Sequence, residues 1–168
     1  MTYKIKQIAL GLFACLALIN FTACGDDDND PTPDPTPTPE EVSASVTYGY
    51  SCQPDMLLMT DITVSYTDAE GKETTETVTE AEWKKELSKV KLPFTANLSI
   101  VYTKKEGFTP ENNSYTFGDG LGISYKRSDN KSESNSSTAS SLSVPKDKVD
   151  AYLDIWITKE KKTSEEIK

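Results

Sequence analysis

The stretch 42-VSASVTYGYS-51 alternates strictly between apolar or aromatic residues and small polar ones. The first set is Val42, Ala44, Val46, Tyr48 and Tyr50. Successive side chains of a β-strand point to opposite faces, so this period of two predicts a strand with one buried and one exposed face. A strand of that kind is typical of antiparallel sheets.

The same alternation returns along most of the remaining chain. It is present in 61-DITVSYT-67, 72-KETTETVT-79, 93-PFTANLSIVYT-103, 114-SYTFGDGLGISYKR-127 and 151-AYLDIWITK-159. Between the first two of these, residues 68–71 read as a turn in which Gly71 supplies a positive φ. Around six half-buried strands predict a mainly all-β fold, an antiparallel immunoglobulin-like β-sandwich.

Two short helices are expected within this pattern. Residues 79–90 begin with a capping box, Thr79 with Glu82, and residues 144–153 carry Pro145 at a first-turn position. The Ser- and Asn-rich residues 128–141 are expected to form a mobile loop, and residues 161–168 a polar tail.

The composition excludes several classes of function. The chain has 168 residues, no histidine and a net charge of −9, and Arg127 is its one arginine. The lack of histidine removes Ser-His-acid triads and His-ligated zinc, and the acidic balance argues against nucleic-acid binding. Because no CxxC or P-loop motif occurs, no metal or other cofactor is expected.

The N-terminus has the organisation of an export signal. Lys4 and Lys6 precede fourteen uncharged residues, 8–21, which are too few to span a bilayer, since about 20 are needed. The four residues that follow the apolar core, 21-FTAC-24, resemble the lipobox of bacterial lipoproteins. That resemblance implies cleavage after Ala23 and lipidation of Cys24. The alternatives are a plain signal peptide, an uncleaved anchor, or the less suitable box 12-LFAC-15.

An acidic run and a proline-rich segment follow Cys24. Residues 25-GDDDND-30 start like an EF-hand loop, but Pro31 and Pro37 stand where that loop needs Gly and Glu. The run instead resembles the export signal of surface lipoproteins of the Bacteroidota, in which Asp26, Asp27 and Asp28 direct the protein outward. Alternating prolines in residues 31–41 predict an extended, disordered tether.

The layout of the whole chain resembles the small β-sandwich surface lipoproteins of the Bacteroidota. It implies a cleaved signal peptide over residues 1–23, a lipidated tether over 24–41, a β-sandwich domain over 42–160 and a polar tail over 161–168. The resemblance further implies an outer-membrane location, with the protein held by its lipid and facing the cell exterior.

Two side chains of the domain are candidates for ligand contact. Trp156 has the parity opposite to Leu153 and Ile155 in the expected last strand, which would expose its ring. Asp119, in 118-GDGLG-122, shares parity with apolar neighbours. A β-bulge that turns Asp119 outward, or a close backbone approach at the glycines, is favoured over an inward acid with a partner.

The expected function is therefore a non-catalytic binding or adhesion module with a glycan or protein partner. Cys52 is the one cysteine that lipidation and signal cleavage leave free, and without a histidine base it is expected to be a small, partly buried residue. The alternatives are a structural or accessory subunit of an outer-membrane complex and a small hydrolase that relies on Asp, Glu, Lys, Tyr or Ser.

Overall fold

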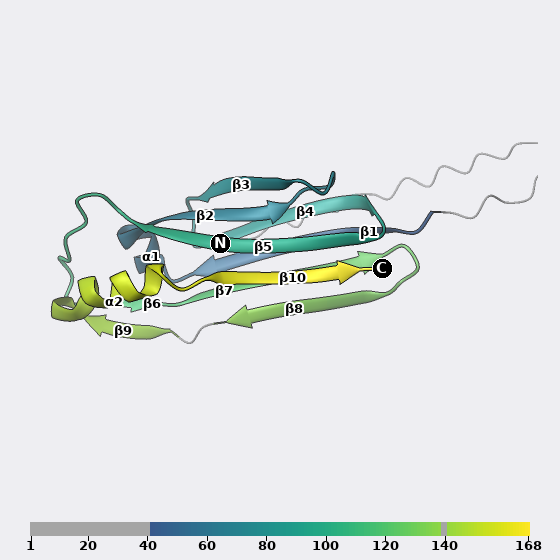
Figure 1. Cartoon of the computed structure of the whole chain (residues 1–168). Helices are drawn as coiled ribbons and strands as arrows, with labels where there is room; N and C mark the ends of the chain where they lie inside the picture. Colours follow the sequence, from purple (N-terminus) through teal and green to yellow (C-terminus); the bar gives the residue numbers. More distant parts are fainter. Residues whose placement is uncertain (1–40, 139–140) are drawn as a thin grey trace, which may run out of the picture. The chain divides into compact units, whose positions relative to one another are not determined.

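The computed structural model describes residues 41–138 and 141–168, and it confirms the predicted mainly β fold. Two four-stranded sheets pack face to face, and all strand pairs in them are antiparallel (Figure 1). The first sheet has the order β4 (Glu82–Lys91), β1 (Ser43–Cys52), β7 (Asp119–Arg127) and β8 (Ser132–Thr138). The second has the order β10 (Lys161–Ile167), β5 (Phe94–Lys104), β2 (Thr60–Thr67) and β3 (Glu73–Val78).

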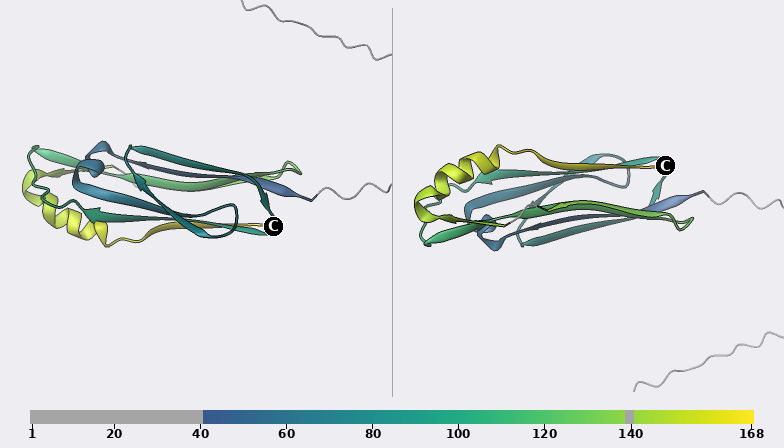
Figure 2. Two further views of the ribbon diagram at one scale, coloured as in Figure 1. Left: turned by 90° about the horizontal axis from the view of Figure 1, so that it is seen from above. Right: turned by 90° about the horizontal axis from the view of Figure 1, so that it is seen from below.

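Short elements gather at one end of this sandwich (Figure 2). They are the helices α1 (Pro54–Met59) and α2 (Val149–Ile157), the 3-10 turn η1 (Lys146–Lys148), and the paired strands β6 (Ser114–Phe117) and β9 (Leu142–Pro145). At the other end Ser43 pairs with Lys91 and Ile167 pairs with Phe94, so β1 begins and β10 ends beside the turn between β4 and β5.

The core lies between the two sheets and follows the predicted parity. Alternate residues of the central strands are fully buried, including Val46, Tyr48, Ile62, Val64, Leu98 and Ile123. Burial of each such side chain contributes about 1.5–3 kcal/mol to folding. Apart from Val101 of β5, the outward residues of the same strands are small or polar, which is why period-two alternation identified these strands.

The helix expected over residues 79–90 is wrong, because this segment contains β4. A bulge explains the misleading spacing: Val46 pairs with Leu87 but Ala44 pairs with Val90, so β4 has one extra residue there. Lys89 takes a positive φ of 57° at this point. The bulge places Leu87 and Val90 on the same face three residues apart, which reproduces a helical interval.

The strand expected over residues 151–159 is also wrong, since most of it belongs to α2. The helix buries Val149, Leu153 and Trp156, at spacings of four and three residues. The helix expected over residues 144–153 is confirmed in its second part, after η1. The helix α1, which has Pro54 in its first turn, was not predicted from the sequence.

Two segments expected to be irregular are strands. The expected mobile loop over residues 128–141 contains β8, which pairs with β7 from Ser132 to Thr138, and the expected polar tail forms β10, which pairs with β5 over its whole length. The β-bulge expected at Asp119 is absent, because β7 pairs with β1 in unbroken register. Asp119 therefore keeps the inward direction of Leu121 and Ile123.

Candidate functional site

Asp119 and Trp156, the two candidate side chains, both contact Lys161 of β10. The Nζ atom of Lys161 lies 3.1 Å from Oδ1 of Asp119 and 4.4 Å from the centroid of the Trp156 ring. The tryptophan face attracts the ammonium group, so the lysine is held by a carboxylate and by a cation-π contact. Lys161 was not singled out from the sequence because it belongs to a lysine-rich segment that read as a tail.

Two tyrosines complete this buried cluster. The hydroxyl of Tyr102 donates a hydrogen bond to Oδ2 of Asp119, and the Tyr50 and Tyr102 hydroxyls lie 3.0 Å apart. Burial raises the pKa of both tyrosines above the ordinary value of 10, so both remain neutral at any physiological pH. Of the two carboxylate oxygens of Asp119, Oδ1 thus contacts Lys161 and Oδ2 accepts the hydrogen bond from Tyr102.

This cluster is a closed part of the interior. Asp119 is 5% exposed and Trp156 is 4% exposed, so the expectation of an exposed Trp156 is wrong. Asp119 follows the less favoured interpretation, an inward acid with a partner. The indole Nε1 of Trp156 is buried and has no hydrogen-bond partner among the residues that the structure describes. The arrangement ties β10 of one sheet to β7 of the other and offers no surface to a large ligand.

A second polar cluster joins the sheets at their opposite edge. The carboxylate of Glu76 in β3 accepts hydrogen bonds from the Tyr66 hydroxyl at 2.8 Å, the Trp83 indole at 3.0 Å and the Lys85 ammonium at 2.7 Å. The lysine and tyrosine donors are the main reason that the pKa of Glu76 falls from the ordinary value of 4.5 to about 2. Glu76 thus stays ionised and holds β3 against β4.

The outer face of the first sheet carries a shallow trough of about 380 Å³. Its middle row crosses all four strands, because Lys84, Gly49, Gly122 and Ser136 are successive lateral neighbours. The adjacent row consists of Glu82, Ser51, Gly120 and Thr138. The trough therefore has a glycine floor, a charged wall on β4 and a hydroxyl-rich wall on β8.

The floor glycines are not required by a positive φ angle, the backbone conformation that favours glycine. The glycines with positive φ are Gly71 and Gly107, within the residues described. A Cβ added at Gly122 would come within 2.9 Å of the Ser136 Cβ, so the favoured close approach between backbones is confirmed there. A Cβ added at Gly49 would meet no described atom within 4 Å. Space above the sheet is thus open at Gly49, where glycine weakens the strand by about 0.5–1 kcal/mol relative to alanine.

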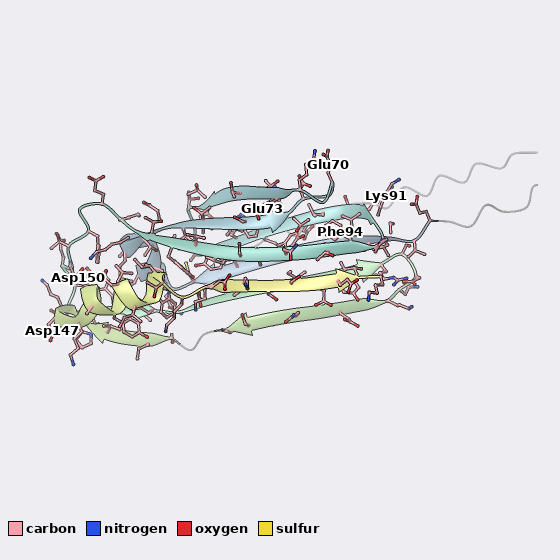
Figure 3. The ribbon with its side chains drawn as sticks, in the orientation of Figure 1. Glu70, Glu73, Lys91, Phe94, Asp147 and Asp150 are labelled. Atoms are coloured by element: carbon pink, nitrogen blue, oxygen red, sulfur yellow. The ribbon has the colours of Figure 1, made fainter. Side chains whose placement is uncertain are left out.

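A second hollow, of about 520 Å³, lies at the helical end of the sandwich. It is lined by Thr109, Pro110, Asn113, Pro145, Lys146, Asp147 and Asp150, and Figure 3 shows the two aspartates at the end remote from Lys91. Asp150 already forms an ion pair with Lys104 at 2.8 Å. The trough lies on four paired strands, whereas loop residues Thr109, Pro110 and Asn113 form part of this hollow.

Burial raises the pKa of the Cys52 thiol, so a reactive thiolate is disfavoured, and Cys52 is half-buried as expected. No group of three or more His, Cys, Asp or Glu side chains is placed to hold a metal ion in residues 41–138 and 141–168. Glu82 and Glu86 lie on the outer face of β4 with Lys84, which forms an ion pair with Glu86.

The predicted lipidation and export residues, namely Ala23, Cys24, Asp26, Asp27 and Asp28, lie outside the described residues. Among the helices of the described segments, none has the length and apolar character needed to cross a membrane. No protein-family model, curated protein or solved structure matches the chain.

Proposed function

We propose that this chain is a lipid-anchored protein of the outer membrane that faces the cell exterior and acts as a non-catalytic binding or adhesion module. The proposed location rests on the sequence. An apolar segment is followed by Ala23 and Cys24, and an acidic run then precedes a proline-rich tether. The lipid on Cys24 is the membrane partner in this proposal, and the sandwich supplies the binding surface.

The trough is the observation that carries the binding role. Three glycines meet on its floor, Gly49, Gly120 and Gly122. At Gly49 a larger residue would fit, since an added Cβ meets no described atom within 4 Å. Glycine in a strand interior often marks a place where another molecule comes close to the backbone. The open space above Gly49 is therefore where the ligand would contact the sheet.

The chemistry of the lining favours a hydroxyl-rich ligand such as an oligosaccharide. Five of the residues that line the trough carry Ser or Thr hydroxyl groups, namely Thr47, Ser51, Ser136, Ser137 and Thr138. Each hydroxyl can donate and accept hydrogen bonds, and so can each hydroxyl of a sugar. Glu82 and Lys84 place opposite charges on one wall, so a strongly charged ligand of either sign would meet repulsion.

The binding role is tested by filling the trough without weakening the fold. The Gly49→Val protein should lose binding to glycans or host surface proteins, since valine would occupy the open floor. Thr103→Val is the matched control: Thr103 is exposed on β5 of the other sheet, remote from the trough. The measurement is a binding screen with the full chain purified in detergent. A ligand bound equally by both variants would place the site elsewhere.

Lipidation has a separate test that does not depend on the trough. Cys24→Ala should abolish incorporation of labelled palmitate in cells, while Cys15→Ala should retain it. Equal labelling of the two variants would contradict lipidation at Cys24.

Surface display is tested on intact cells by protease treatment. Wild-type cells should lose the domain, and cells with Asp26, Asp27 and Asp28 changed to alanine should retain it. A wild-type domain that survives protease treatment of intact cells would contradict an outward orientation.

A further inference from the structure

The four sheet edges differ in how they are protected against pairing with another strand. Edge strands are normally blocked by charges, bulges, proline or short length. In the first sheet β4 has alternating Lys and Glu residues and the bulge at Lys89. In the second, β3 carries Glu73 and Glu76, and β10 carries two lysines and two glutamates.

The edge strand β8 has none of these protections except one charge. Its seven residues, SESNSST, contain neither lysine nor proline, and Glu133 is the one charged residue among them. The register with β7 is regular over all seven positions. All seven side chains are exposed, and no described strand other than β7 pairs with β8. One row of its backbone N–H and C=O groups is therefore free to pair with an added strand.

We propose that β8 is a self-association edge, at which two copies of the chain pair antiparallel about Asn135. The first sheets would join into one eight-stranded sheet with twofold symmetry, an isologous contact in which both copies use the same residues. The pairing requires no ligand in the trough, although Ser136 and Thr138 belong to both surfaces.

The side chains of β8 are complementary to themselves in this register. Ser134 would lie opposite Ser136 of the second copy and Ser132 opposite Thr138, so hydroxyl groups meet on the outer face. Pairs of Ser and Thr across strands can exchange hydrogen bonds. Glu133 would lie opposite Ser137, and the two Glu133 side chains would be about 14 Å apart, given about 3.4 Å per residue. Like charges are therefore not opposed.

The small size of the contact implies a weak dimer. One seven-residue strand pair buries less than the roughly 800 Å² per partner that is usual for stable complexes. The pair would therefore form chiefly where copies are concentrated. Its geometry has a functional consequence, because the two outer faces lie on the same side of a joined sheet. Both troughs would open in one direction and present two sites to a repeating ligand.

Site-directed cross-linking of the full chain in cells tests this pairing. Asn135→Cys places two thiols across the twofold axis, where opposite Cα atoms of an antiparallel pair lie about 4.5–5.5 Å apart, within the range of a disulfide. Addition of a mild oxidant should produce a covalent dimer that reductant reverses. Thr75→Cys is the matched control, since Thr75 is an exposed residue on the protected edge strand β3.

The register gives a second measurement. In cells that produce two differently tagged copies, Ser134→Cys in one and Ser136→Cys in the other should cross-link several-fold more than two copies of Ser134→Cys. Cross-linking of Asn135→Cys no greater than that of Thr75→Cys would overturn the proposal. Stronger cross-linking between two Ser134→Cys copies than in the mixed pair would overturn the register about Asn135.

Discussion

Lys161 and Asp119 connect the last strand to the opposite sheet, with the ammonium nitrogen 3.1 Å from the carboxylate. Lys85 and Glu76 make the corresponding connection at the other edge, at 2.7 Å. The polarity is reversed between the two, because the first sheet supplies the acid in one pair and the lysine in the other. Each lysine also lies near an aromatic ring, Trp156 or Tyr66. The sandwich is thus closed at both edges by a lysine, a carboxylate and aromatic groups.

Removal of one member of the buried pair should be strongly destabilising. Asp119→Ala leaves the Lys161 ammonium without its carboxylate and the Tyr102 hydroxyl without its acceptor. Loss of one partner from a buried ion pair typically lowers the free energy of unfolding by about 3–5 kcal/mol. Urea unfolding of the variant and the wild type measures this difference.

The double variant distinguishes pairing from simple loss of packing. Asp119→Ala combined with Lys161→Met should be less destabilising than the sum of the two single changes, because no unpaired charge remains in the interior. Strictly additive effects would mean that the two side chains do not stabilise each other.

Glu76 should make stability depend on pH in the acid range. Its pKa is about 2 in the folded protein and near 4.5 ordinarily, so the unfolded chain binds a proton first as the pH falls. The stabilisation is present above about pH 4.5 and is lost as the pH falls towards 2. Because the Glu76 and Lys85 side chains are 34% and 39% exposed, solvent screening limits the effect to about 1 kcal/mol.

The check is Glu76→Gln, with urea unfolding measured between pH 2 and pH 7. The free energy of unfolding of the variant should fall less than that of the wild type between pH 4.5 and pH 2. Parallel curves for the two proteins would show that Glu76 is not held ionised by its neighbours.

Two adjacent residues of α2 should respond very differently to truncation. Trp156→Ala should lower the free energy of unfolding by about 3–5 kcal/mol because the ring is buried against Phe117, Tyr102 and Tyr152. Ile155→Ala should change it by less than about 0.5 kcal/mol, since Ile155 is 58% exposed. Thermal unfolding followed by circular dichroism compares the two variants. A larger loss of stability for Ile155→Ala than for Trp156→Ala would contradict the helix and favour the strand expected for this segment.

The floor glycines of the trough should differ when changed to alanine. Gly49→Ala should stabilise the protein by about 0.5–1 kcal/mol, because alanine restricts the unfolded chain and its Cβ enters open space. Gly122→Ala should destabilise it, because the new Cβ would lie 2.9 Å from that of Ser136. Chemical unfolding of both variants against the wild type measures the two effects, and destabilisation by Gly49→Ala would mean that the trough floor is not open.

The sequence predicted β1, β2 and β5, which bury one face at a regular period of two, and missed β8 and β10. Alternation in β1, β2 and β5 reflects a real division between core and solvent, so it identified them. No such division exists in β8, whose side chains are all exposed, and β10 buries fully only Ile167. Both strands pair through backbone hydrogen bonds, which depend little on side-chain type, and their polar composition therefore resembled a loop and a tail.

Only single residues of the candidate sites could be predicted from the sequence, and their arrangement in space could not. The glycines of 118-GDGLG-122 were noticed, but their meeting with Gly49 depends on the pairing of β1 with β7. The parity argument for Trp156 failed because a short apolar segment fits both a strand and a helix. The partner of Asp119 carried no local signal, since Lys161 is 42 residues away and is one of several lysines near the C-terminus.

The position of Ser43 determines how the domain would bear a mechanical load. A pull on the preceding chain enters at β1, which is hydrogen-bonded to β4 on one side and to β7 on the other along nearly its whole length. A ligand held over Gly49 would resist that pull farther along the same strand. The force would then run parallel to β1 and load the hydrogen bonds to β4 and to β7 together, in shear. These bonds would have to break together and could not open one after another from one end of the strand.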